Sequence, residues 1–258
     1  MHAPQNAALL WSGGKDSALA LHHARRDHPG LRVARLVTCL SQAYDRVSMH
    51  GVRRQLIADQ AEALGLPVDF VVIPHQEDPT CPMAHTAPCT SFPPNDTYTR
   101  TMLEAFRRLE GDGAQVVVFG DIFLEDLRAF RDRLLDLAGL RGCYPLWGRD
   151  SGELYDEFHA LGFRAVTCCV DTERLTEGHC GQPLTPAFRA SLPAGVDPCG
   201  ERGEYHSFTF AGPPFRRPVP FRLSGLHRQG PFVFQELYPG DGQETERAPA
   251  VATAVRCP

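Results

Sequence analysis

The stretch Trp11-Ser12-Gly13-Gly14-Lys15-Asp16-Ser17 lies between two apolar segments of different character. Before it, residues 7–11 form a short apolar run, which predicts a buried strand. After it, an Ala- and Leu-rich run to about Arg26 predicts a helix. A strand that turns directly into a helix leaves backbone N–H groups without helical partners at the positive end of the helix dipole. The stretch therefore predicts an anion-binding loop.

Each residue type in this loop suits an anion. The two glycines let the chain turn and let an anion approach the backbone, the two serines add hydroxyl donors, and the lysine adds charge. Lys15 is the one lysine among 26 Lys and Arg residues, as expected where a compact ammonium cannot be replaced by a guanidinium. The spacing differs from that of a Walker A loop. The candidate anion-binding residues here are Ser12, Gly13, Gly14, Lys15, Asp16 and Ser17; Asp16 could instead only cap the helix.

Strand and helix patterns alternate after the loop. Alternation at this spacing predicts a parallel sheet with helices on both faces, which is a doubly wound, Rossmann-like α/β domain. The next predicted strands are 31–40, 68–73 and 115–119, and the predicted helices are 51–64, ended by Gly65, 98–109 and 124–137.

The composition of the sequence changes in its second half. A short strand at 144–147, a helix at 152–161 and a strand at 163–170 are predicted, and from about residue 172 Gly and Pro become frequent. Short strand-like runs follow at 205–210, 221–226 and 231–237. We therefore expect an α/β domain with the anion-binding loop at 1–144, a smaller C-terminal α+β domain at 145–238, and a mobile tail at 239–258.

Composition limits the classes of function. The chain has 258 residues, is 43% hydrophobic and 22% charged, and carries a formal net charge of −5. This charge argues against nucleic-acid binding by bulk electrostatics. The sequence shows neither an apolar run of about 20 residues nor a basic segment leading into a signal-peptide core. We expect a cytoplasmic protein that does not bind membranes.

The nine cysteines do not form a recognisable metal or disulfide pattern. No C-x-x-C occurs, which removes the strongest sign of a zinc ribbon, an iron–sulfur cluster or a dithiol. Cys168, Cys169 and Cys199 are expected to pack in the interior. A long Pro-rich segment at 74–94 is expected to be a lid, although His75, Cys81, His85 and Cys89 within it could supply four metal ligands.

Several motifs resemble a known family. Ser12 to Ser17 resembles the PP-loop of the ATP pyrophosphatases in the adenine nucleotide α-hydrolase-like superfamily. Four further motifs, over about residues 7–237, resemble the diphthamide synthetase (diphthine–ammonia ligase) family, in its bacterial form. They are Met49-His50-Gly51-Val52 with Arg54, Phe119-Gly120-Asp121-Ile122, Pro145-Leu146-Trp147-Gly148-Arg149-Asp150, and Gly200-Glu201-Arg202-Gly203-Glu204-Tyr205-His206.

The resemblance implies an ATP site with Mg²⁺. Lys15 would stabilise the departing pyrophosphate, and the backbone near Thr38 and Cys39 would meet adenine. Asp121 would hold Mg²⁺ or the ribose, unless it only caps the next helix. His50 would touch a phosphate or the substrate, with a plain surface role as the alternative. Arg54 would pair with an acid or a phosphate.

The resemblance also implies an acceptor site at the last motif. Glu201, Glu204 and His206 would bind the acceptor or move protons, and a solvated acidic turn is the alternative. Archaeal and eukaryotic members tend to show Glu-Gly-Gly-Glu-Tyr/Phe-Glu here, whereas this chain has Arg202 and His206. The acceptor therefore stays open.

The predicted function is an ATP-dependent, amide-forming ligase. It would adenylate a carboxylate of a small molecule or a protein side chain, release pyrophosphate, and transfer ammonia or an amine. One alternative is an RNA-modifying PP-loop enzyme that adenylates a base before thiolation or amination; the absence of a C-x-x-C pair and of a basic stripe argues against it. The other is a sensor that binds ATP without turnover.

Overall fold

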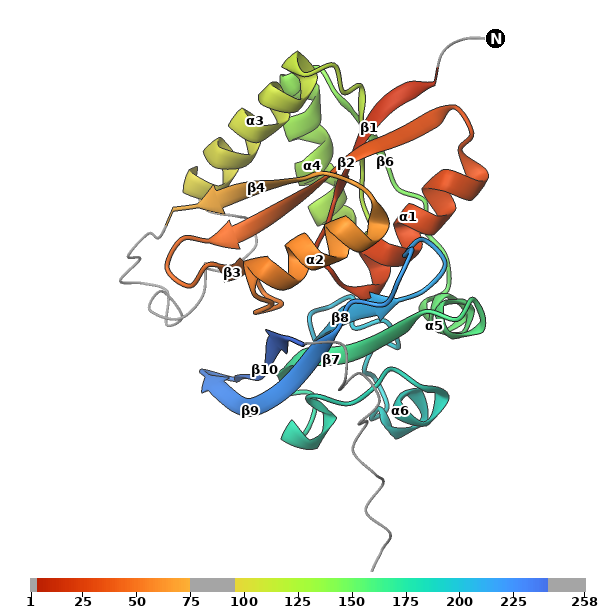
Figure 1. Ribbon diagram of the computed structural model, residues 1–258, viewed down its shortest axis with the longest axis vertical. Helices are drawn as coiled ribbons and strands as arrows, with labels where there is room; N and C mark the ends of the chain where they lie inside the picture. The colour runs from red at the N-terminus through yellow and green to blue at the C-terminus, as the bar shows by residue number, and fades with distance from the viewer. Residues whose placement is uncertain (1–3, 75–95, 241–258) are drawn as a thin grey trace, which may run out of the picture.

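The computed structural model describes residues 4–74 and 96–240 and contains two β-sheets (Figure 1). The larger sheet has the order β3-β2-β1-β5-β6, with β4 paired to β2. All of its pairs are parallel except that of β3 with the end of β2. Its strands are β1 (Gln5–Leu10), β2 (Leu31–Ser41), β3 (Arg46–Val47), β4 (Val68–Ile73), β5 (Val116–Val118) and β6 (Arg141–Cys143).

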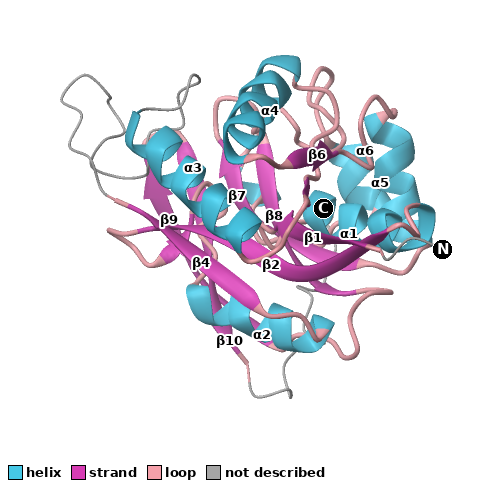
Figure 2. Cartoon of the chain, turned by 90° about the horizontal axis from the view of Figure 1, so that it is seen from above, coloured by secondary structure: helices cyan, strands magenta, loops and turns pink. Residues whose placement is uncertain are grey.

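Helices cover both faces of this sheet, as Figure 2 shows from above. Alternate residues of β1 enter different cores, because successive side chains of a strand point to opposite faces. Ala7 and Leu9 join a cluster with α1 (Lys15–Asp27) and α2 (Arg54–Leu64), while Ala8 joins one with α3 (Asp96–Gly111) and α4 (Glu125–Ala138). The predicted doubly wound α/β architecture is confirmed.

The smaller sheet is antiparallel, with the order β8-β7-β10-β9, and lies below the first in Figure 1. Three short helices accompany it: α5, capped at its start by Asp150, η1 and α6. The ranges are α5 (Ser151–Ala160), β7 (Arg164–Asp171), η1 (Glu177–His179), α6 (Pro186–Ser191), β8 (Tyr205–Ala211), β9 (Phe221–Gln229) and β10 (Phe232–Pro239).

The two sheets share one hydrophobic cluster, which runs from α1 and α2 into β7, β8 and β10. Backbone hydrogen bonds also join the two parts: Thr209 N–H donates to the carbonyl of Gly13 at 2.8 Å, and Arg216 N–H to that of Ala63 at 2.7 Å. The division into domains at 144/145 stays a prediction. Pro239, where the expected tail begins, is the last residue of β10, and residues 241–258 lie outside the described part.

Some predicted boundaries differ from the structure. The expected strand at 144–147 is wrong: these residues form a turn, and β6 ends at Cys143, opposite the last residue of β5. Leu146 is fully buried by packing rather than by strand pairing, and a short apolar run cannot distinguish these two cases. The helix expected from residue 51 begins only at Arg54, since Gly51 has a φ of +68°. Gly65 ends this helix in the left-handed conformation, as predicted.

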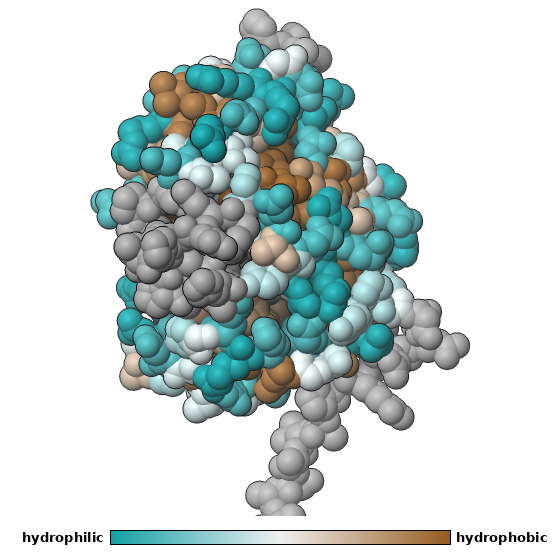
Figure 3. All heavy atoms as spheres, turned by 90° about the vertical axis from the view of Figure 1, so that its left-hand side faces the viewer, coloured by the Kyte–Doolittle hydropathy of each residue, from teal (hydrophilic) through white to brown (hydrophobic). Residues whose placement is uncertain are grey.

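One face of the molecule is largely polar where its residues are described (Figure 3). Figure 3 shows one face, on which hydrophilic residues predominate and apolar residues occupy smaller areas. Among residues 4–74 and 96–240, no helix has the length and apolar character needed to cross a bilayer.

Candidate functional site

The loop after β1 turns sharply into α1. Gly13 has a φ of +82°, which a glycine adopts without strain, and Gly14 is the N-cap of the helix. Ser17 is buried in the first turn and donates its hydroxyl to the carbonyl of Gly14 at 3.0 Å. The N–H groups of Asp16 and Ser17 have no carbonyl four residues back within the helix. This turn therefore presents backbone donors at the positive end of the dipole.

The loop leaves no space for a side chain at Gly14. A Cβ atom there would lie 2.8 Å from Cε1 of His50 and 3.1 Å from the carbonyl oxygen of Ser207. The loop thus lies directly against the turn before α2 and against β8. These three segments are far apart in the sequence.

Lys15 begins α1 and is only 2% exposed. Its Nζ contacts the carboxylate of Asp16, and its backbone N–H donates to Oγ of Ser207 at 3.1 Å. Burial favours the neutral amine, but the charge of Asp16 and the nearby Cys199 thiol outweigh it and raise the pKa of Lys15. Lys15 therefore remains an ammonium at neutral pH.

A pocket of about 400 Å³ opens beside this first turn. Its wall comes from the end of β1, the turn before α2, the segment after β5, the face of α4 and the start of β8. The lining residues are Leu10, Trp11, Ser12, Asp16, Ser17, Cys39, Val47, Ser48, Met49, His50, Tyr98, Gly120, Asp121, Leu127, Arg131, Cys199, Gly200, Glu201, Tyr205, His206 and Ser207. The volume lies within the ~300–1,000 Å³ typical of small-molecule sites.

Asp121, just after β5, lies at the pocket beside Arg131. Its Oδ2 forms an ion pair with Nε of Arg131 at 3.0 Å, but neither atom makes a hydrogen bond among the described residues. Burial raises the pKa of Asp121, and the charge of Arg131 opposes this shift. A cation in the pocket could bind this carboxylate.

Glu201 joins the turn before β8 to the segment after β5. Its Oε1 accepts a hydrogen bond from the N–H of Ile122 at 2.8 Å. Burial, followed by the negative charge of Asp16, raises the pKa of Glu201 to about 8. Glu201 can therefore exchange a proton near neutral pH.

Two histidine rings lie against each other at the pocket. The ring centres of His50 and His206 are 4.6 Å apart with the planes tilted by 40°, and Nδ1 of His50 lies 3.1 Å from the carbonyl oxygen of Ser207. Because a carbonyl can only accept, Nδ1 carries the proton and Nε2 is free to accept. Burial lowers the pKa of His50 to about 4 and lowers that of His206 as well. Both rings are neutral at physiological pH.

Most of the predicted site residues meet at this pocket. Ser12, Asp16, Ser17, His50, Asp121, Glu201 and His206 line it, and Gly13 and Gly14 form the loop beneath them. Cys39 also lines it, whereas Thr38 is fully buried and donates to the carbonyl of Trp11 at 2.7 Å. Lys15 does not line the pocket and is buried behind its wall. Arg54 does not line it either, and its guanidinium lies 2.6 Å from the carboxylate of Asp45.

Glu204 is placed differently from Glu201. It is 4% exposed, and its two carboxylate oxygens accept from the backbone N–H groups of Asp197 and Arg202, each at 3.0 Å. Glu204 therefore stabilises the turn that holds Glu201, and its role toward an acceptor stays a prediction. Cys168, Cys169 and Cys199 are buried, as expected.

Sequence reasoning missed several pocket residues. Arg131 and Leu127 come from α4, Tyr98 from α3 and Ser207 from β8. Arg131 also lies 4.6 Å from the ring centre of Phe119. The sequence does not distinguish Arg131 from the other arginines. Only the packing of α4 brings its side chain to the end of β5. Ser207 was the one missed residue with a signal in the sequence, because it carries a hydroxyl and directly follows the predicted site residue His206.

Within the described ranges, no three His, Cys, Asp or Glu side chains are arranged to hold a metal ion. Mg²⁺ at Asp121 would therefore need phosphate oxygens and water as further ligands, which is how it commonly binds. The candidate ligands His75, Cys81, His85 and Cys89 lie outside the described residues.

Residues 5–81 match the family model described as the diphthamide synthase N-terminal domain. No curated protein matches the chain. Two solved structures are similar. A predicted subunit of tRNA methyltransferase from Methanocaldococcus jannaschii is 15% identical, with a TM-score of 0.39, over 62% of this chain and 77% of that one. The U34-tRNA thiolase NcsA from Methanococcus maripaludis, with its 4Fe-4S cluster, is 14% identical, with a TM-score of 0.35, over 62% of this chain and 59% of that one.

The matched segment contains the loop from Ser12 to Ser17 and the motif beginning at Met49. The predicted resemblance to the diphthamide synthetase family of PP-loop proteins is therefore confirmed for this N-terminal part of the chain.

Proposed function

We propose that the chain is an ATP-dependent ligase that adenylates a carboxylate and transfers ammonia or an amine to it. The proposal depends mainly on the loop from Ser12 to Ser17. This loop presents backbone donors and hydroxyls at the wall of a 400 Å³ pocket that also contains Glu201 and Asp121. The match of residues 5–81 to a diphthamide synthase domain supports the ATP-using part of the proposal.

The loop suits the polyphosphate of ATP. The N–H groups of Asp16 and Ser17 and the hydroxyl of Ser12 would bind phosphate oxygens. Lys15 would exchange its contact with Asp16 for the charge that develops on the leaving pyrophosphate. Cys39 and Leu10 provide an apolar wall for adenine.

The charges at the pocket are paired before ATP binds, because Asp16 contacts Lys15 and Asp121 lies beside Arg131. Glu201, with a pKa of about 8, is mostly protonated at neutral pH. A tetra-anionic triphosphate would add uncompensated negative charge unless a cation accompanied it. The carboxylate of Asp121 would hold Mg²⁺. Bound Mg²⁺ would neutralise charge on the phosphates.

The reaction has two steps. A carboxylate oxygen attacks the α-phosphorus of ATP, the bond from this phosphorus to the bridging oxygen of the β-phosphate breaks, and pyrophosphate leaves with the electron pair. Ammonia then attacks the acyl carbon, the bond to the AMP oxygen breaks, and AMP and one proton are released. Glu201, whose pKa is about 8, is suited to take this proton. The neutral rings of His50 and His206 would hydrogen-bond the acceptor.

Product analysis tests the proposal. The protein would be incubated with Mg·ATP, ammonium and a dialysable metabolite extract, and phosphorus NMR would follow the products. We expect AMP and pyrophosphate in equal amounts, together with a metabolite converted to its amide as detected by mass spectrometry. ADP and inorganic phosphate as the products would contradict cleavage at the α-phosphorus.

The same assay separates the alternatives. An RNA-modifying PP-loop reaction would require RNA, so AMP formation would depend on the RNA fraction and be lost after ribonuclease treatment. A sensor would bind ATP in calorimetry but form no AMP with any fraction. Amide formation from the small-molecule fraction alone supports the ligase.

A further inference from the structure

A second pocket, of about 310 Å³, lies between the β2–β3 turn and one face of the smaller sheet. The β2–β3 turn contributes Tyr44, β3 contributes Arg46 and the turn after β3 contributes Met49. The smaller sheet contributes His227, Phe234 and Glu236. His227 and Phe234 are paired residues of β9 and β10, so they lie side by side on this face. The volume is at the lower end of the ~300–1,000 Å³ range for small-molecule sites.

The second pocket adjoins the first. Val47, Ser48 and Met49 line both of them. Asp45 and Met49 have φ angles of 50° and 69°, and they are the only residues other than glycine with positive φ in the ranges the structure describes. Such strained backbone gathers at ligand sites more often than elsewhere. Met49, which lines both pockets, is thus held in an unusual conformation.

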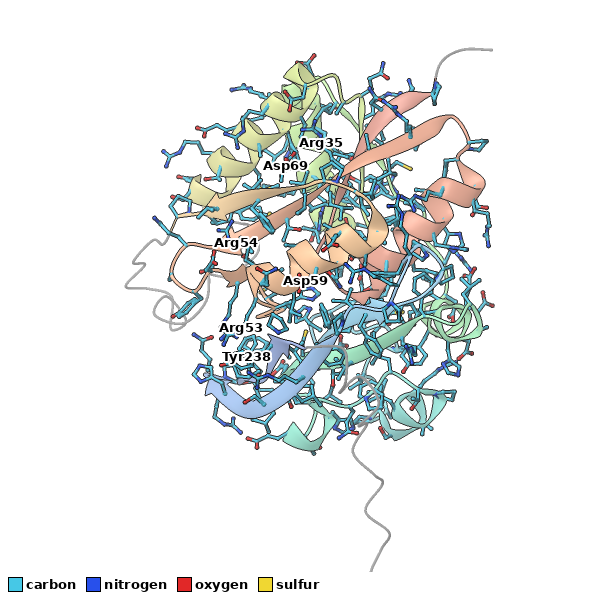
Figure 4. The ribbon with its side chains drawn as sticks, in the orientation of Figure 1. Arg35, Arg53, Arg54, Asp59, Asp69 and Tyr238 are labelled. Carbon is cyan, nitrogen blue, oxygen red and sulfur yellow. The ribbon has the colours of Figure 1, made fainter. Side chains whose placement is uncertain are left out.

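At one end of the second pocket, the lining residues Arg46 and Glu236 are joined by a further arginine, Arg53. Nη2 of Arg46 and Nη2 of Arg53 lie 2.8 and 2.9 Å from the same carboxylate oxygen of Glu236. The guanidinium groups of Arg53 and Arg222 lie 4.0 and 4.6 Å from the ring centre of Tyr238. Figure 4 shows Arg53 pointing from the start of α2 toward Tyr238 of β10. Two arginines therefore share one carboxylate, and a third lies on the neighbouring tyrosine ring.

This local excess of arginine over carboxylate contrasts with the net charge of −5 for the chain. The nearby Arg54 and Asp45 pair with each other at 2.6 Å and cancel. Partial burial tends to raise the pKa of Glu236, but its hydrogen bonds and charge contacts with Arg46 and Arg53 lower it overall, so the carboxylate is ionised. It cannot neutralise two arginines at once.

We propose that the second pocket binds the acid that the enzyme activates, as a small molecule with an apolar body and an anionic group at Arg46. Tyr44, Met49 and Phe234 would contact the body, and the reacting carboxylate would pass Ser48 and Met49 into the nucleotide pocket. The inference rests on the proposed ligase function. A separate anionic group fits the arginines, since one carboxylate cannot both react at ATP and bind at Arg46.

The test uses the aromatic sulfonate 8-anilinonaphthalene-1-sulfonate, which combines an apolar body with an anionic group. Its fluorescence would be titrated with the full-length wild type, Arg46→Gln and Glu236→Gln. Both substitutions break the same ion pair, but one removes a positive charge and the other a negative charge. We expect the dissociation constant to rise roughly tenfold for Arg46→Gln and to fall for Glu236→Gln.

The opposite directions separate a charge effect from a loss of structure, because damage to the fold would weaken binding in both variants. Arg228→Gln is the matched control: Arg228 is an exposed arginine of the same β9 strand that pairs with Glu177 and does not line the pocket. It should bind the sulfonate as the wild type does. Thermal melts would show that each variant is folded.

Competition identifies the pocket and the class of ligand. Saturating Mg·ATP should leave the sulfonate bound, and glutarate should displace it. Four results would each overturn the inference. The first two are equal affinity in all variants and weaker binding in both Arg46→Gln and Glu236→Gln. The others are displacement by ATP and displacement by a single-stranded RNA oligonucleotide at lower concentration than by glutarate. AMP formation is measured separately, so a ligase without this second site is distinguishable from a protein that is no ligase.

Discussion

At the scale of single residues, the candidate site depends on charged groups that are largely removed from water. Lys15, Asp121 and Glu204 are each less than 9% exposed, yet each has different partners. Lys15 contacts a carboxylate, Glu204 accepts two backbone hydrogen bonds, and Asp121 keeps one oxygen without a hydrogen bond among the described residues. Of the three, only Asp121 lines the pocket, so its carboxylate is the one that a bound cation would reach.

Replacing Lys15 tests the role of its charge. We expect Lys15→Ala to reduce AMP formation by about 10²–10³-fold, as the loss of one group that stabilises developing charge does elsewhere. The measurement is the rate of pyrophosphate release, with nucleotide affinity from calorimetry. Arg26→Ala, at an exposed position of the same helix, is the control and should keep full activity. A folded Lys15→Ala protein with wild-type turnover would remove Lys15 from the mechanism.

Glu201 should make the stability of the ligand-free protein depend on pH. Its pKa is about 8 in the folded protein, above the value of 4.5 for an unperturbed glutamate. Between these two values the folded state binds more protons than the unfolded state, so stability falls as pH rises. We expect Tm to decrease from pH 6 to pH 9, and to decrease less in Glu201→Gln.

The control for this dependence is Glu104→Gln, at an exposed position of α3. It should show the same decrease in Tm as the wild type. A slope that is identical in the wild type and Glu201→Gln would show that Glu201 titrates as an ordinary surface carboxylate.

At the scale of elements, the site depends on how closely the end of β5 approaches the first turn of α1. A Cβ atom on Gly120 would lie 2.8 Å from the carbonyl carbon of Asp16 and 3.0 Å from the backbone nitrogen of Ser17. Both contacts are to backbone, which cannot move away as a side chain can. A small residue after β5 therefore lets the strand end and the helix start contribute to the same pocket.

Gly120→Ala should disturb this contact. We expect a loss of about 1–3 kcal/mol of stability, typical of overpacking, and weaker ATP binding because the first turn of α1 is displaced. Urea denaturation and calorimetry measure the two effects. Gly111→Ala is the matched control: Gly111 is in α3, an added Cβ meets nothing within 4 Å, and Ala there should be neutral or stabilising. Equal stability of the two variants would mean that the β5–α1 contact adapts without cost.

At the scale of the whole molecule, Gln60 of α2 joins the two sheets. It is fully buried: Oε1 accepts from Nε1 of Trp11 at 2.8 Å, and Nε2 donates to the carbonyls of Gly13 and Thr209 at 3.0 and 2.6 Å. One amide thus connects the end of β1, the loop before α1 and strand β8. The position of the loop relative to the smaller sheet depends on this side chain.

Gln60→Leu keeps the size of the side chain but removes all three hydrogen bonds. We expect a loss of about 2–4 kcal/mol, because the Trp11 N–H loses its acceptor and the Thr209 carbonyl its donor while both stay buried. Urea denaturation measures it, and a weaker affinity for ATP should accompany it. Gln55→Leu, on the exposed side of the same helix, should change stability by less than about 0.5 kcal/mol. Similar losses in both variants would mean that Gln60 has no special role in joining the sheets.

The sequence alone was sufficient for the doubly wound fold, the loop from Ser12 to Ser17 and the ending of α2 at Gly65, because local patterns specify each of them. It could not distinguish the roles of Glu201 and Glu204, because they are two carboxylates in one turn. Only in the folded chain is Glu204 held by backbone donors within its own turn, whereas Glu201 reaches Ile122 at the pocket. Nor could the sequence bring Arg131 to Asp121, or place Arg46 and Arg53 on one carboxylate of β10. The first contact depends on how α4 packs beside the end of β5. The contacts with Glu236 join residues distant in the chain, and only the packing of the smaller sheet brings them within reach of each other.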